Sequence, residues 1–482
     1  MNRSSLASRL FALSTAAVLL SSCGGAKTTI PSPISAELQP DEAPNVLSGR
    51  SDSKIQHVVI LVQENRSLNN LFYGFPGAKT AKFGYDHKNN KIVLKPVSLA
   101  TKWDLAHEAA GFLAACNGTG KIPGTHCRMN GFDKEPRGLG VQPPMPYPQY
   151  SYVPHNESKP LFDIAKQYVL ADEMFASNFD ASSFVSHQYI ISAQAGSTIN
   201  YPTSYWGCQG AKADLIWTVT KVRGYGNQIQ PCFDNKTLAD ELDQKRLPWA
   251  FYATPVSSRY MNDADSVEDA DSADVAVSGN YKENSGIWVA YQAIKQIYHG
   301  PDWGKDIFSP PAQFLTDVSH GHLRTVTWIT PTWANSDHAG SNSTTGPSWV
   351  ASVVNAIGES KYWDSTVLFV FWDDYGGWYD SQPPAYLDYD GLGIRVPLLI
   401  VSAYAKKGHV SHVHYEHGSI LKFIEDRFGL GRLQASDTRA NSPLNDCFDF
   451  SKPPRKFVPI QAPYDANFFE HQPLDFHPPD TN

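Results

Sequence analysis

The sequence predicts an α/β fold built on a mostly parallel sheet that is buried on both faces. Four continuous apolar runs, rich in β-branched residues, are typical of strands in such a sheet. They lie at 55–62, 325–330, 366–372 and 396–402. Helical patterns accompany them at 348–357 and at 420–428, and Gly429 closes the second. The alternation of strand and helix favours a doubly wound sheet.

Composition and charge limit the classes of protein to which the chain can belong. Its 482 residues are 41% hydrophobic and 12% aromatic, which excludes a disordered chain and allows a large core. The formal net charge of −8 argues against a nucleic-acid partner and against binding to anionic membranes by charge. A phosphate substrate remains compatible with this charge, because a bound metal ion and nearby histidines can set the local field.

The N-terminus predicts export. Arg3 and Arg9 precede an apolar run from Leu10 to Leu20, which is too short to span a bilayer as a permanent helix. Small residues then lead to Cys23, and this arrangement resembles the cleavage box of a bacterial lipoprotein. Residues 1–22 are therefore expected to be a signal peptide. Cys23 would be lipidated and would anchor the mature chain to the membrane of the bacterial cell envelope, on the periplasmic or cell-surface side. The alternative is an ordinary signal peptide with an incidental cysteine.

The rest of the chain divides into three segments. Residues 23–52 are rich in Ser, Pro, Ala and Gly and predict a flexible tether. Residues 53–450 carry the α/β pattern and are expected to form one large domain. Within that domain, the irregular stretch at about 197–310, with an acidic run at 263–274, predicts a cap-like insertion. The proline-rich residues 451–482 predict a tail that wraps the surface.

The cysteines predict disulfides rather than a metal site. If the cysteine of the lipoprotein box is acylated, five of the six cysteines remain, and an exported chain meets an oxidising compartment. Proximity in sequence favours one bond between Cys116 and Cys127 and another between Cys208 and Cys232, which leaves Cys447 single. None of the spacings is that of a zinc site.

Acidic and amide side chains follow two of the predicted strands where those strands end. Glu64 and Asn65 follow the first run, and Asp373 and Asp374 follow the third. The carboxyl ends of parallel strands are where α/β sheets place their sites. Adjacent aspartates after a buried strand are costly to bury unless a cation neutralises them; the alternative is a solvated loop. Such oxygen ligands predict one divalent metal ion, and Ca, Mg, Mn or Fe is favoured over Zn, which prefers more imidazole.

The motifs around these positions follow an order that resembles a known family. The series runs from QENRS at 63–67 to ILKFIE at 420–425 and covers roughly residues 54–450. Between them come DLAH at 104–107, MNGF at 129–132, ASSFVSHQ at 181–188, SDH at 336–338, GPSW at 346–349, DDYGGWYD at 373–380 and RVP at 395–397. The series resembles the bacterial phosphoesterase family of phospholipases C and acid phosphatases, which is related to alkaline phosphatases and arylsulfatases. The resemblance implies an alkaline phosphatase-like α/β/α sandwich with a mostly parallel central sheet and an inserted cap region, and it makes residues 53–450 the catalytic domain.

The resemblance also implies a metal site and a nucleophile. The metal ligands would be Glu64, Asn65, Asp373 and Asp374. The nucleophile would be Ser183, since a serine becomes reactive when a metal ion lowers its pKa. The neighbouring Ser182 competes for this role, but Ser183 fits the family's S-F-x-x-H-Q pattern. Either serine would otherwise cap a helix that begins here, and a helix N-terminus also favours an anion.

Histidines are the expected partners of the phosphoryl oxygens. The resemblance implies that His107 and His338 bind those oxygens or protonate the leaving group, because phosphoryl transfer needs positive charge there. His187 is also expected near the substrate. Further histidines crowd near the motifs, and His412 is preferred as a third site histidine from the set at 320, 322, 412, 414 and 417. His57, inside the first strand, is expected to be structural.

The expected function is hydrolysis of phosphate mono- or diesters, with phospholipid as one candidate substrate and a phosphoseryl intermediate. Ser381 and Gln382 depart from the family, in which a histidine often follows the GGWYD run, and this departure puts the substrate class in question. One alternative is a catalytically silent surface lipoprotein, and another is a sulfatase, whose signature string occurs at Ser451–Arg455 in the far tail. Four aromatic residues would form either an apolar rim for acyl chains or part of the core: Trp103, Tyr205, Trp206 and Trp378.

Overall fold

The computed structural model describes residues 54–478 except Arg137, Leu139, Ser204, Ala211 and residues 256–285. The predicted signal peptide, the lipidation site Cys23, the predicted tether and the acidic run at 263–274 lie outside the described residues. All described residues belong to one compact unit. The described parts of the predicted catalytic domain and of the predicted tail therefore lie in the same unit.

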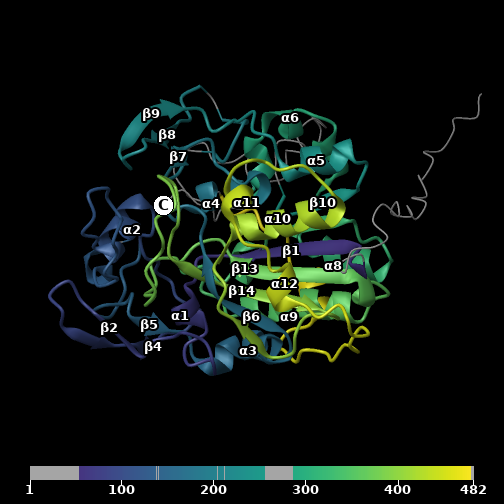
Figure 1. Cartoon of the computed structure of the whole chain (residues 1–482), viewed down its shortest axis with the longest axis horizontal. Helices are drawn as coiled ribbons and strands as arrows, with labels where there is room; N and C mark the ends of the chain where they lie inside the picture. Colours follow the sequence, from purple (N-terminus) through teal and green to yellow (C-terminus); the bar gives the residue numbers. More distant parts are fainter. Residues whose placement is uncertain are drawn as a thin grey trace, which may run out of the picture. The chain divides into compact units, whose positions relative to one another are not determined.

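A nine-stranded sheet runs through the described residues (Figure 1). Its hydrogen-bonded order is β11-β10-β12-β1-β13-β14-β6-β15, with β16 beside β6. The strands are β1 His57–Gln63, β6 Val169–Phe175, β10 Trp249–Tyr252, β11 Ile307–Phe308, β12 Val326–Ile329, β13 Thr366–Trp372, β14 Arg395–Ser402, β15 His409–Ser411 and β16 Tyr415–Glu416. The predicted α/β class is confirmed, and the four apolar runs correspond to β1, β12, β13 and β14.

Most neighbouring strands of this sheet are parallel. β1 pairs in parallel with β12 and β13, β10 with β11 and β12, and β6 with β15 and β16. β14 is the exception, because it runs antiparallel to both β13 and β6. Its sequence does not mark this direction, since an apolar run indicates burial on both faces and not direction. Two antiparallel steps restore the direction, so β1, β13 and β6 have their carboxyl ends at the same edge.

The central strands are apolar because both of their faces are covered. Every residue of β13 is buried, and so is every residue of β1 after His57. Ile60 in β1 lies between Trp328 of β12 and Phe369 of β13. Burial of a large apolar side chain stabilises a fold by about 1.5–3 kcal/mol. The centre of the sheet is therefore a main part of the core, and it holds the strand ends in place.

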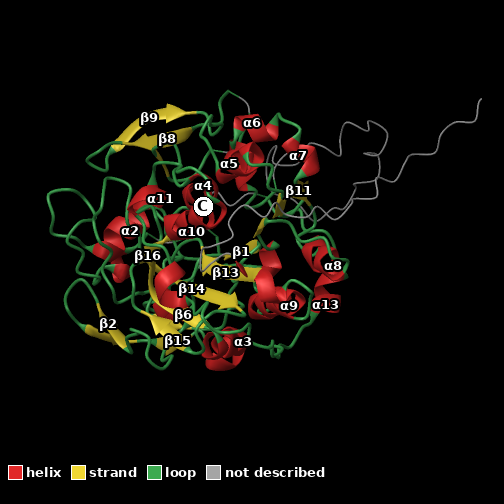
Figure 2. Ribbon diagram, turned by 45° about the vertical axis from the view of Figure 1, so that its right-hand side comes forward, coloured by secondary structure: helices red, strands yellow, loops and turns green. Residues whose placement is uncertain are grey.

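Helices cover both faces of the sheet (Figure 2). On one side lie α4 (Ser183–Ser192) and α10 (His417–Phe428), which contact each other. On the other side lie α3 (His155–Gln167) and α9 (Gly346–Gly358), and α8 (Gln313–Ser319) and α13 (Ala466–Glu470) pack against α9. The two predicted helices are confirmed as α9 and α10. Gly429 ends α10 with a positive φ of 62°, a conformation that glycine adopts without strain.

The described residues of the range 197–310, which the sequence predicts as an insertion, do not all lie outside the central sheet. The first part of the range forms a separate antiparallel sheet of β7 (Thr198–Ile199), β8 (Ile216–Val219) and β9 (Tyr225–Ile229), which α5 (Leu238–Gln244) follows. β10 and β11 instead belong to the central sheet, so the predicted insertion does not hold for that part of the range. These strands have only four and two residues, and runs this short carry little periodic signal.

The segment between β1 and β6 contains small elements that face the carboxyl ends of the strands. They are α1 (Leu68–Leu71), α2 (Ala109–Cys116), β2 (Phe83–Tyr85) paired with β3 (Lys91–Val93), and β4 (Lys95–Pro96) paired with β5 (Ser151–Tyr152). Further short helices are α6 (Lys295–Tyr298), α7 (Asp302–Lys305), α11 (Ser436–Arg439) and α12 (Leu444–Cys447).

Disulfides join Cys116 to Cys127 and Cys208 to Cys232, and Cys447 is a buried free thiol, as the spacing predicts.

The described part of the C-terminal tail packs along α9. The Asn355 side-chain amide donates to the Ile460 carbonyl at 2.9 Å and accepts from the Ile460 N–H at 2.8 Å. Phe469 packs against Trp349, and His477 stacks on Trp333 with ring centres 4.0 Å apart. The chain therefore returns to the sheet edge where β1 and β13 end.

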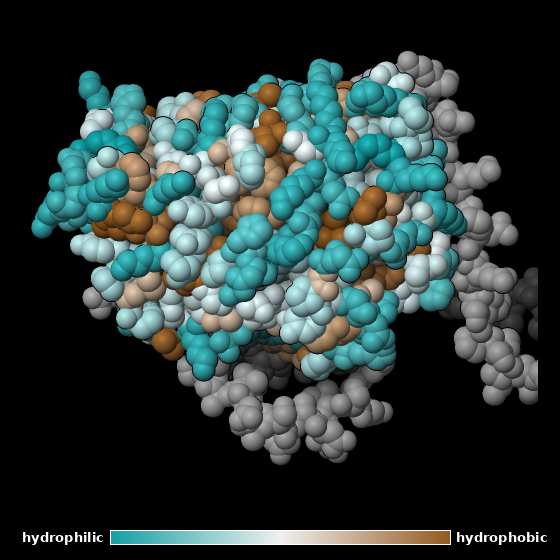
Figure 3. All heavy atoms as spheres, turned by 90° about the horizontal axis from the view of Figure 1, so that it is seen from below, coloured by the Kyte–Doolittle hydropathy of each residue, from teal (hydrophilic) through white to brown (hydrophobic). Residues whose placement is uncertain are grey.

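The surface of the unit is mixed in character. On the face drawn in Figure 3, hydrophobic residues form separate patches among hydrophilic ones. Patches of this kind are common on protein surfaces. Within the described residues, no helix combines the length and the apolar character that crossing a membrane requires.

Candidate active site

Two pairs of polar residues leave the sheet side by side at the ends of β1 and β13. Gln63 and Trp372 are register partners, so Glu64–Asn65 and Asp373–Asp374 emerge next to each other. The Asn65 N–H donates to Asp373 Oδ1 at 3.0 Å, and Asn65 has a positive φ of 57°. All four residues are fully buried. The predicted metal ligands are therefore adjacent, and a hydrogen bond links the two pairs.

Gly376 allows this close approach of the two loops. Its φ is 61°, and a Cβ at this position would lie 2.2 Å from the Asn65 carbonyl oxygen. Its N–H donates to Asp374 Oδ1 at 2.7 Å, which orients the carboxylate. A side chain at position 376 would push the two loops apart. The first glycine of the DDYGGWYD run is thus required by both conformation and space.

Ser183 is the first residue of α4 and faces these pairs. Its Oγ lies 3.4 Å from Asn65 Oδ1 and 3.4 Å from Asp374 Oδ2. Ser182 points elsewhere, because its one hydroxyl hydrogen is shared between Asp180 Oδ2, 2.9 Å from Oγ, and the Asn200 carbonyl oxygen, 3.1 Å from Oγ. Of the two adjacent serines, only Ser183 has its hydroxyl among the predicted ligands.

His107 and His338 meet at the Asn65 side chain. Their Nε2 atoms lie 2.8 and 2.9 Å from Asn65 Nδ2, and both rings are buried. On the other side of each ring, Nδ1 contacts a backbone carbonyl, of Leu105 for His107 and of Ala339 for His338. A carbonyl only accepts, so Nδ1 carries the hydrogen and Nε2 faces the site. The structure thus brings both predicted histidines to Ser183.

His187 lies with the predicted metal ligands. Its Nε2 is 2.9 Å from Glu64 Oε1 and 3.9 Å from Asp373 Oδ2. Ligand atoms of Glu64, His187 and Asp373 all fall within 4.8 Å of one another, and all three residues are buried. Asp373 Oδ2 accepts no hydrogen bond from the described residues. Buried carboxylates gathered in this way fit a metal cation, which would neutralise them.

His412 does not join this group, which corrects the sequence prediction. Its side chain is half-exposed, and its Nδ1 contacts Asp172 Oδ1 of β6 at 2.8 Å. His417 instead is the third histidine near the predicted metal ligands. It is buried at the start of α10, and the centre of its ring lies 5.4 Å from that of Phe371, two residues before Asp373. Burial lowers the pKa of His417 to about 4, although the nearby Asp373 opposes the shift. Sequence spacing could not choose between these histidines, because the choice depends on where α10 begins.

Tyr201 is a member of the site that the sequence did not indicate. Its hydroxyl lies 3.2 Å from His107 Nε2 and accepts the Ser183 N–H at 3.3 Å. Tyr201 follows β7, in the range predicted as a cap. No motif or periodic pattern marks it.

Arg66 supports the site from behind. Its Nε donates to the Asp337 carbonyl at 2.8 Å, and its guanidinium lies 4.6 Å from the centre of the Trp378 ring. Burial lowers the pKa of Arg66 to about 10, against the attraction of Asp337. Burial also raises the pKa of Asp337 to about 6, although Arg66 opposes this. This contact fixes the loop that carries His338.

Arg395 and Asp380 form a second support. Arg395 Nε lies 3.1 Å from Asp380 Oδ1, and both side chains are fully buried. Asp380 Oδ2 also accepts the Asn69 N–H at 3.1 Å. The pair ties the end of the DDYGGWYD run to β14 and to α1. Ser381, where the family often has histidine, follows directly and contacts Gln382.

Three of the four aromatic residues considered for an apolar rim belong to the interior. Trp206 and Trp378 are fully buried, and Trp103 is nearly so. Trp206 packs against His187 and Phe184, and Trp103 packs against Trp378. Their observed role is packing around the site.

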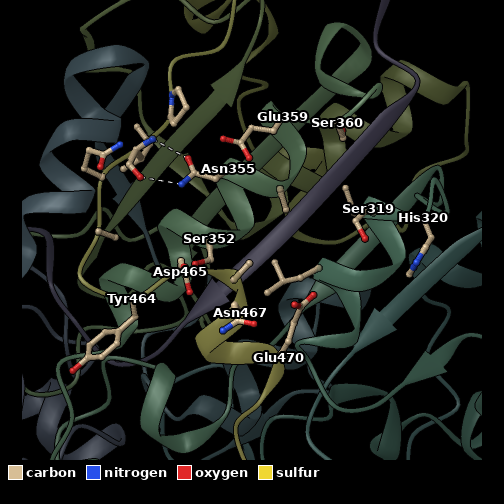
Figure 4. Close-up of a pocket in the computed structure, with 18 of the residues that line it drawn as sticks. Ser319, His320, Ser352, Asn355, Glu359, Ser360, Tyr464, Asp465, Asn467 and Glu470 are labelled. Atoms are coloured by element: carbon tan, nitrogen blue, oxygen red, sulfur yellow. Dashed lines mark hydrogen bonds between the residues drawn. The ribbon is translucent and has the colours of Figure 1, made fainter.

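The cavity drawn in Figure 4 is separate from these residues. It has a volume of about 920 Å³ and opens between α8, α9 and the C-terminal tail. His320 lines it, together with Asn355 and Tyr464. None of the predicted metal ligands and neither Ser183 nor His107 is among its lining residues. His320 thus belongs to another part of the molecule than the candidate active site.

The sulfatase-like string lies away from the strand ends that carry the acidic pairs. The Ser451 hydroxyl donates to Asp449 Oδ1, and the Arg455 N–H donates to the Ala403 carbonyl. Ala403 follows β14, which runs antiparallel to β13, so it lies at the opposite edge of the sheet. Ser451 is therefore not placed to act with the predicted metal ligands.

Comparison with known proteins identifies the family. The family model described as "Phosphoesterase family" matches residues 55–431. The chain belongs to this phosphoesterase family. The resemblance seen in the motif series is therefore confirmed, and the match covers both acidic pairs, Ser183 and the two histidines.

Several named relatives are phospholipases C. Non-specific phospholipase C6 of Arabidopsis thaliana is 30% identical over 186 residues, which are 32% of this phosphoesterase and 34% of that protein. Non-specific phospholipase C1 of the same plant is 22% identical over 440 residues, or 82% and 70% of the two chains. Non-hemolytic phospholipase C of Burkholderia pseudomallei is 23% identical over 423 residues, or 78% and 55%. The matched regions thus span between about a third and 70% of these relatives.

Solved structures also match this phosphoesterase at low identity. One is a protein in the alkaline phosphatase superfamily from Vibrio parahaemolyticus, with a TM-score of 0.33, 10% identity and coverage of 80% and 70% of the two chains. Another is the lipoteichoic acid synthase LtaP from Listeria monocytogenes, with a TM-score of 0.33, 9% identity and coverage of 78% and 72%.

Proposed function

We propose that this phosphoesterase is a metal-dependent hydrolase of phosphoric esters that uses Ser183 as its nucleophile. The observation that carries the proposal is the position of Ser183 Oγ, 3.4 Å from both Asn65 Oδ1 and Asp374 Oδ2. Glu64 and Asp373, which adjoin Asn65 and Asp374 in sequence, have ligand atoms within 4.8 Å of each other and of a ligand atom of His187. A hydroxyl that faces candidate metal ligands is the arrangement that nucleophilic attack on phosphorus requires.

The metal ligands in this proposal are Glu64, Asn65, Asp373 and Asp374. The set is rich in oxygen, which suits calcium, magnesium, manganese or iron better than zinc, and His187 adds one imidazole beside it. When bound, the cation would lower the pKa of the serine hydroxyl and offset negative charge on the phosphoryl group. The buried Asp373 Oδ2, which accepts no hydrogen bond from the described residues, supports this assignment.

The reaction then proceeds in two displacements. Ser183 Oγ releases its proton to solvent and bonds to phosphorus as the bond from phosphorus to the alcohol oxygen breaks, and this leaves a phosphoseryl intermediate. The departing alkoxide takes up a proton from His107 or His338 in its protonated form, since their Nε2 atoms face the site, and the histidine regains that proton from solvent. Water next bonds to phosphorus as the bond from phosphorus to Ser183 Oγ breaks, and a proton of that water restores the serine hydroxyl. Free phosphate leaves from a monoester, and a phosphate monoester leaves from a diester.

Two observations bear on the substrate class, namely the names of the relatives and the departure of residue 381 from the family pattern. The named relatives are phospholipases C, which supports a phosphodiester such as a phospholipid. Position 381 holds serine where the family often has histidine, and this departure keeps a phosphomonoester, the substrate of an acid phosphatase, as the second candidate. Comparison of kcat/KM for p-nitrophenylphosphorylcholine and for p-nitrophenyl phosphate decides between a diester and a monoester.

The mechanism is tested by substitution and metal removal. Ser183→Ala is expected to lower kcat by at least about a thousandfold, because the nucleophile is lost. Ser192→Ala is the matched control, since Ser192 lies at the other end of α4 and bonds to the Gln188 carbonyl. Treatment with chelator should abolish turnover, and the added metal that restores it identifies the cation. Activity that survives in Ser183→Ala would contradict the nucleophile, and no turnover of any ester would favour the silent lipoprotein.

We also propose that the mature protein is exported and lipid-anchored through Cys23 in the bacterial envelope, without a nucleic-acid partner. The proposal rests on the resemblance of residues 1–23 to a lipoprotein signal. Expression of the full chain in a bacterium with labelled palmitate should label the wild type and not Cys23→Ser. Equal labelling of the two would refute the anchor.

A further inference from the structure

Tyr201 stands at the nucleophile although no motif marks it. Its hydroxyl accepts the Ser183 N–H at 3.3 Å and lies 3.2 Å from His107 Nε2. A phenol has one hydrogen to donate and two lone pairs to accept with. Its oxygen thus sits between the backbone of the proposed nucleophile and a proposed proton donor.

We propose that Tyr201 is a further catalytic residue that donates its hydroxyl hydrogen to an oxygen of the phosphoryl group on Ser183. The inference rests on the proposed function and names an additional phosphate contact of the same site. It concerns a residue of the segment after β7, whereas the other proposed groups follow β1, β12 and β13, precede α2 or lie in α4.

The position of Ser183 supports this role. Ser183 opens α4, a helix of ten residues, and the N–H groups of a first helical turn favour anionic oxygens. The Ser183 N–H and Oγ belong to one residue, so phosphorus bonded to that Oγ brings its own oxygens close to the N–H. The Tyr201 hydroxyl, which touches this N–H, is in reach of the same oxygens. His107 lies on its other side.

The backbone before Tyr201 is held by the same carboxylate that holds the nucleophile loop. Asp180 Oδ2 accepts both the Ser182 hydroxyl at 2.9 Å and the Asn200 N–H at 2.7 Å. The Asn200 carbonyl in turn accepts the Ser182 hydroxyl at 3.1 Å. Asp180 is buried, so this connection is shielded from water. Tyr201 and Ser183 are thus positioned as one preorganised unit, which is what a group that binds a transition state needs.

Tyr225 provides a matched control. Its hydroxyl contacts Asn200 Nδ2 at 2.9 Å, one residue away from Tyr201, and its side chain is exposed. Tyr201→Phe removes a phenolic oxygen of the segment after β7, and Tyr225→Phe removes one in β9 that contacts the same segment through Asn200. Only the first removes an oxygen that contacts Ser183 and His107. If the loss of phosphate affinity or turnover came only from a weaker attachment of the segment after β7, both variants should show it.

The test measures phosphate affinity and turnover in the metal-loaded full chain. Isothermal calorimetry with inorganic phosphate should show Kd raised about tenfold or more in Tyr201→Phe, the effect of one lost hydrogen bond to a charged group. The same variant should lose at least about tenfold in kcat/KM for p-nitrophenyl phosphate, and Tyr225→Phe should stay within about twofold of the wild type in both.

Two results would overturn the inference. One is a phosphate Kd in Tyr201→Phe within about twofold of the wild type, and the other is an equal loss in both phenylalanine variants. Calorimetry does not need turnover. A wild type that binds phosphate but hydrolyses no ester would therefore refute the proposed function, while the two variants would still decide the role of Tyr201.

Discussion

Replacement of Asp380 by asparagine removes one partner of a buried ion pair and keeps the side-chain volume. Arg395 donates to both carboxylate oxygens of Asp380, at 3.1 Å from Nε and 3.2 Å from Nη2, and neither side chain is exposed. Burial raises the pKa of Asp380 in spite of the attraction of Arg395. Desolvation therefore outweighs attraction in this pair, which as a whole contributes little net stability.

The loss from one partner alone is expected to be large. Asp380→Asn leaves the Arg395 charge buried and uncompensated, which costs about 3–5 kcal/mol of unfolding free energy. Arg395→Met should cost a comparable amount, because it also removes donors to the Asp172 and Lys79 carbonyls at 2.7 and 2.8 Å. The double variant should lose less than the sum by at least about 2 kcal/mol, since no unpaired charge then remains.

Urea denaturation at equilibrium measures these differences from the midpoint at constant m-value. Lys295→Met is the control, because Lys295 and Asp234 pair at 3.7 Å through exposed side chains, and this variant should cost less than about 1 kcal/mol. Additive losses in the double variant would refute the reasoning. A loss below about 1 kcal/mol in Asp380→Asn would also refute it.

Three further perturbations follow from the contacts of the site. Gly376→Ala should destabilise the fold by about 2 kcal/mol and lower kcat/KM at least tenfold, because its φ is 61° and the Cβ would meet the Asn65 carbonyl at 2.2 Å; urea denaturation and an ester assay check this. Asp390 accepts from Tyr189 at 2.8 Å, and burial raises the pKa of Asp390 to about 7. The folded state thus holds the carboxyl proton of Asp390 more tightly than the unfolded state does. The stability that this proton contributes is fully present below the ordinary pKa of 3.8 and is lost as the pH rises to about 7. The loss is on the order of 4 kcal/mol. The free energy of unfolding of Asp390→Asn, measured by urea denaturation, should therefore rise relative to that of the wild type between pH 4.5 and pH 7.5. If the difference between the two proteins is the same at both pH values, the raised pKa of Asp390 is contradicted. Asp475→Ala removes the carboxylate that accepts the backbone N–H of Trp333 at 2.6 Å. Because the ring centres of Trp333 and His338 lie 4.4 Å apart, kcat/KM should fall about threefold to tenfold while the melting temperature stays nearly unchanged. Unaltered kinetics would exclude a role for the C-terminal tail in the site.

The strand ends of the site could be predicted because they depend on local pattern. Seven apolar residues followed by Asp373 and Asp374 indicate a buried strand and its end, and the same holds for the run before Glu64. Parallel neighbours in register then bring the two ends together, as the pairing of Gln63 with Trp372 shows. The motif series added Ser183, His107 and His338, and the disulfides followed from proximity in sequence.

The remaining contacts were decided by tertiary packing. An apolar run shows that a strand is buried but not its direction, so β14 could not be assigned as antiparallel. β6 was missed because Asp172 and Glu173 interrupt its apolar pattern, although both are buried. His417 rather than His412 reaches the site because α10 begins at His417 and packs on β13. Tyr201 reaches Ser183 through the Asp180 contacts. By itself the sequence determined which segments are buried and where they end, because those are local properties; which side chains meet there depends on how helices and loops distant in the chain pack against the sheet.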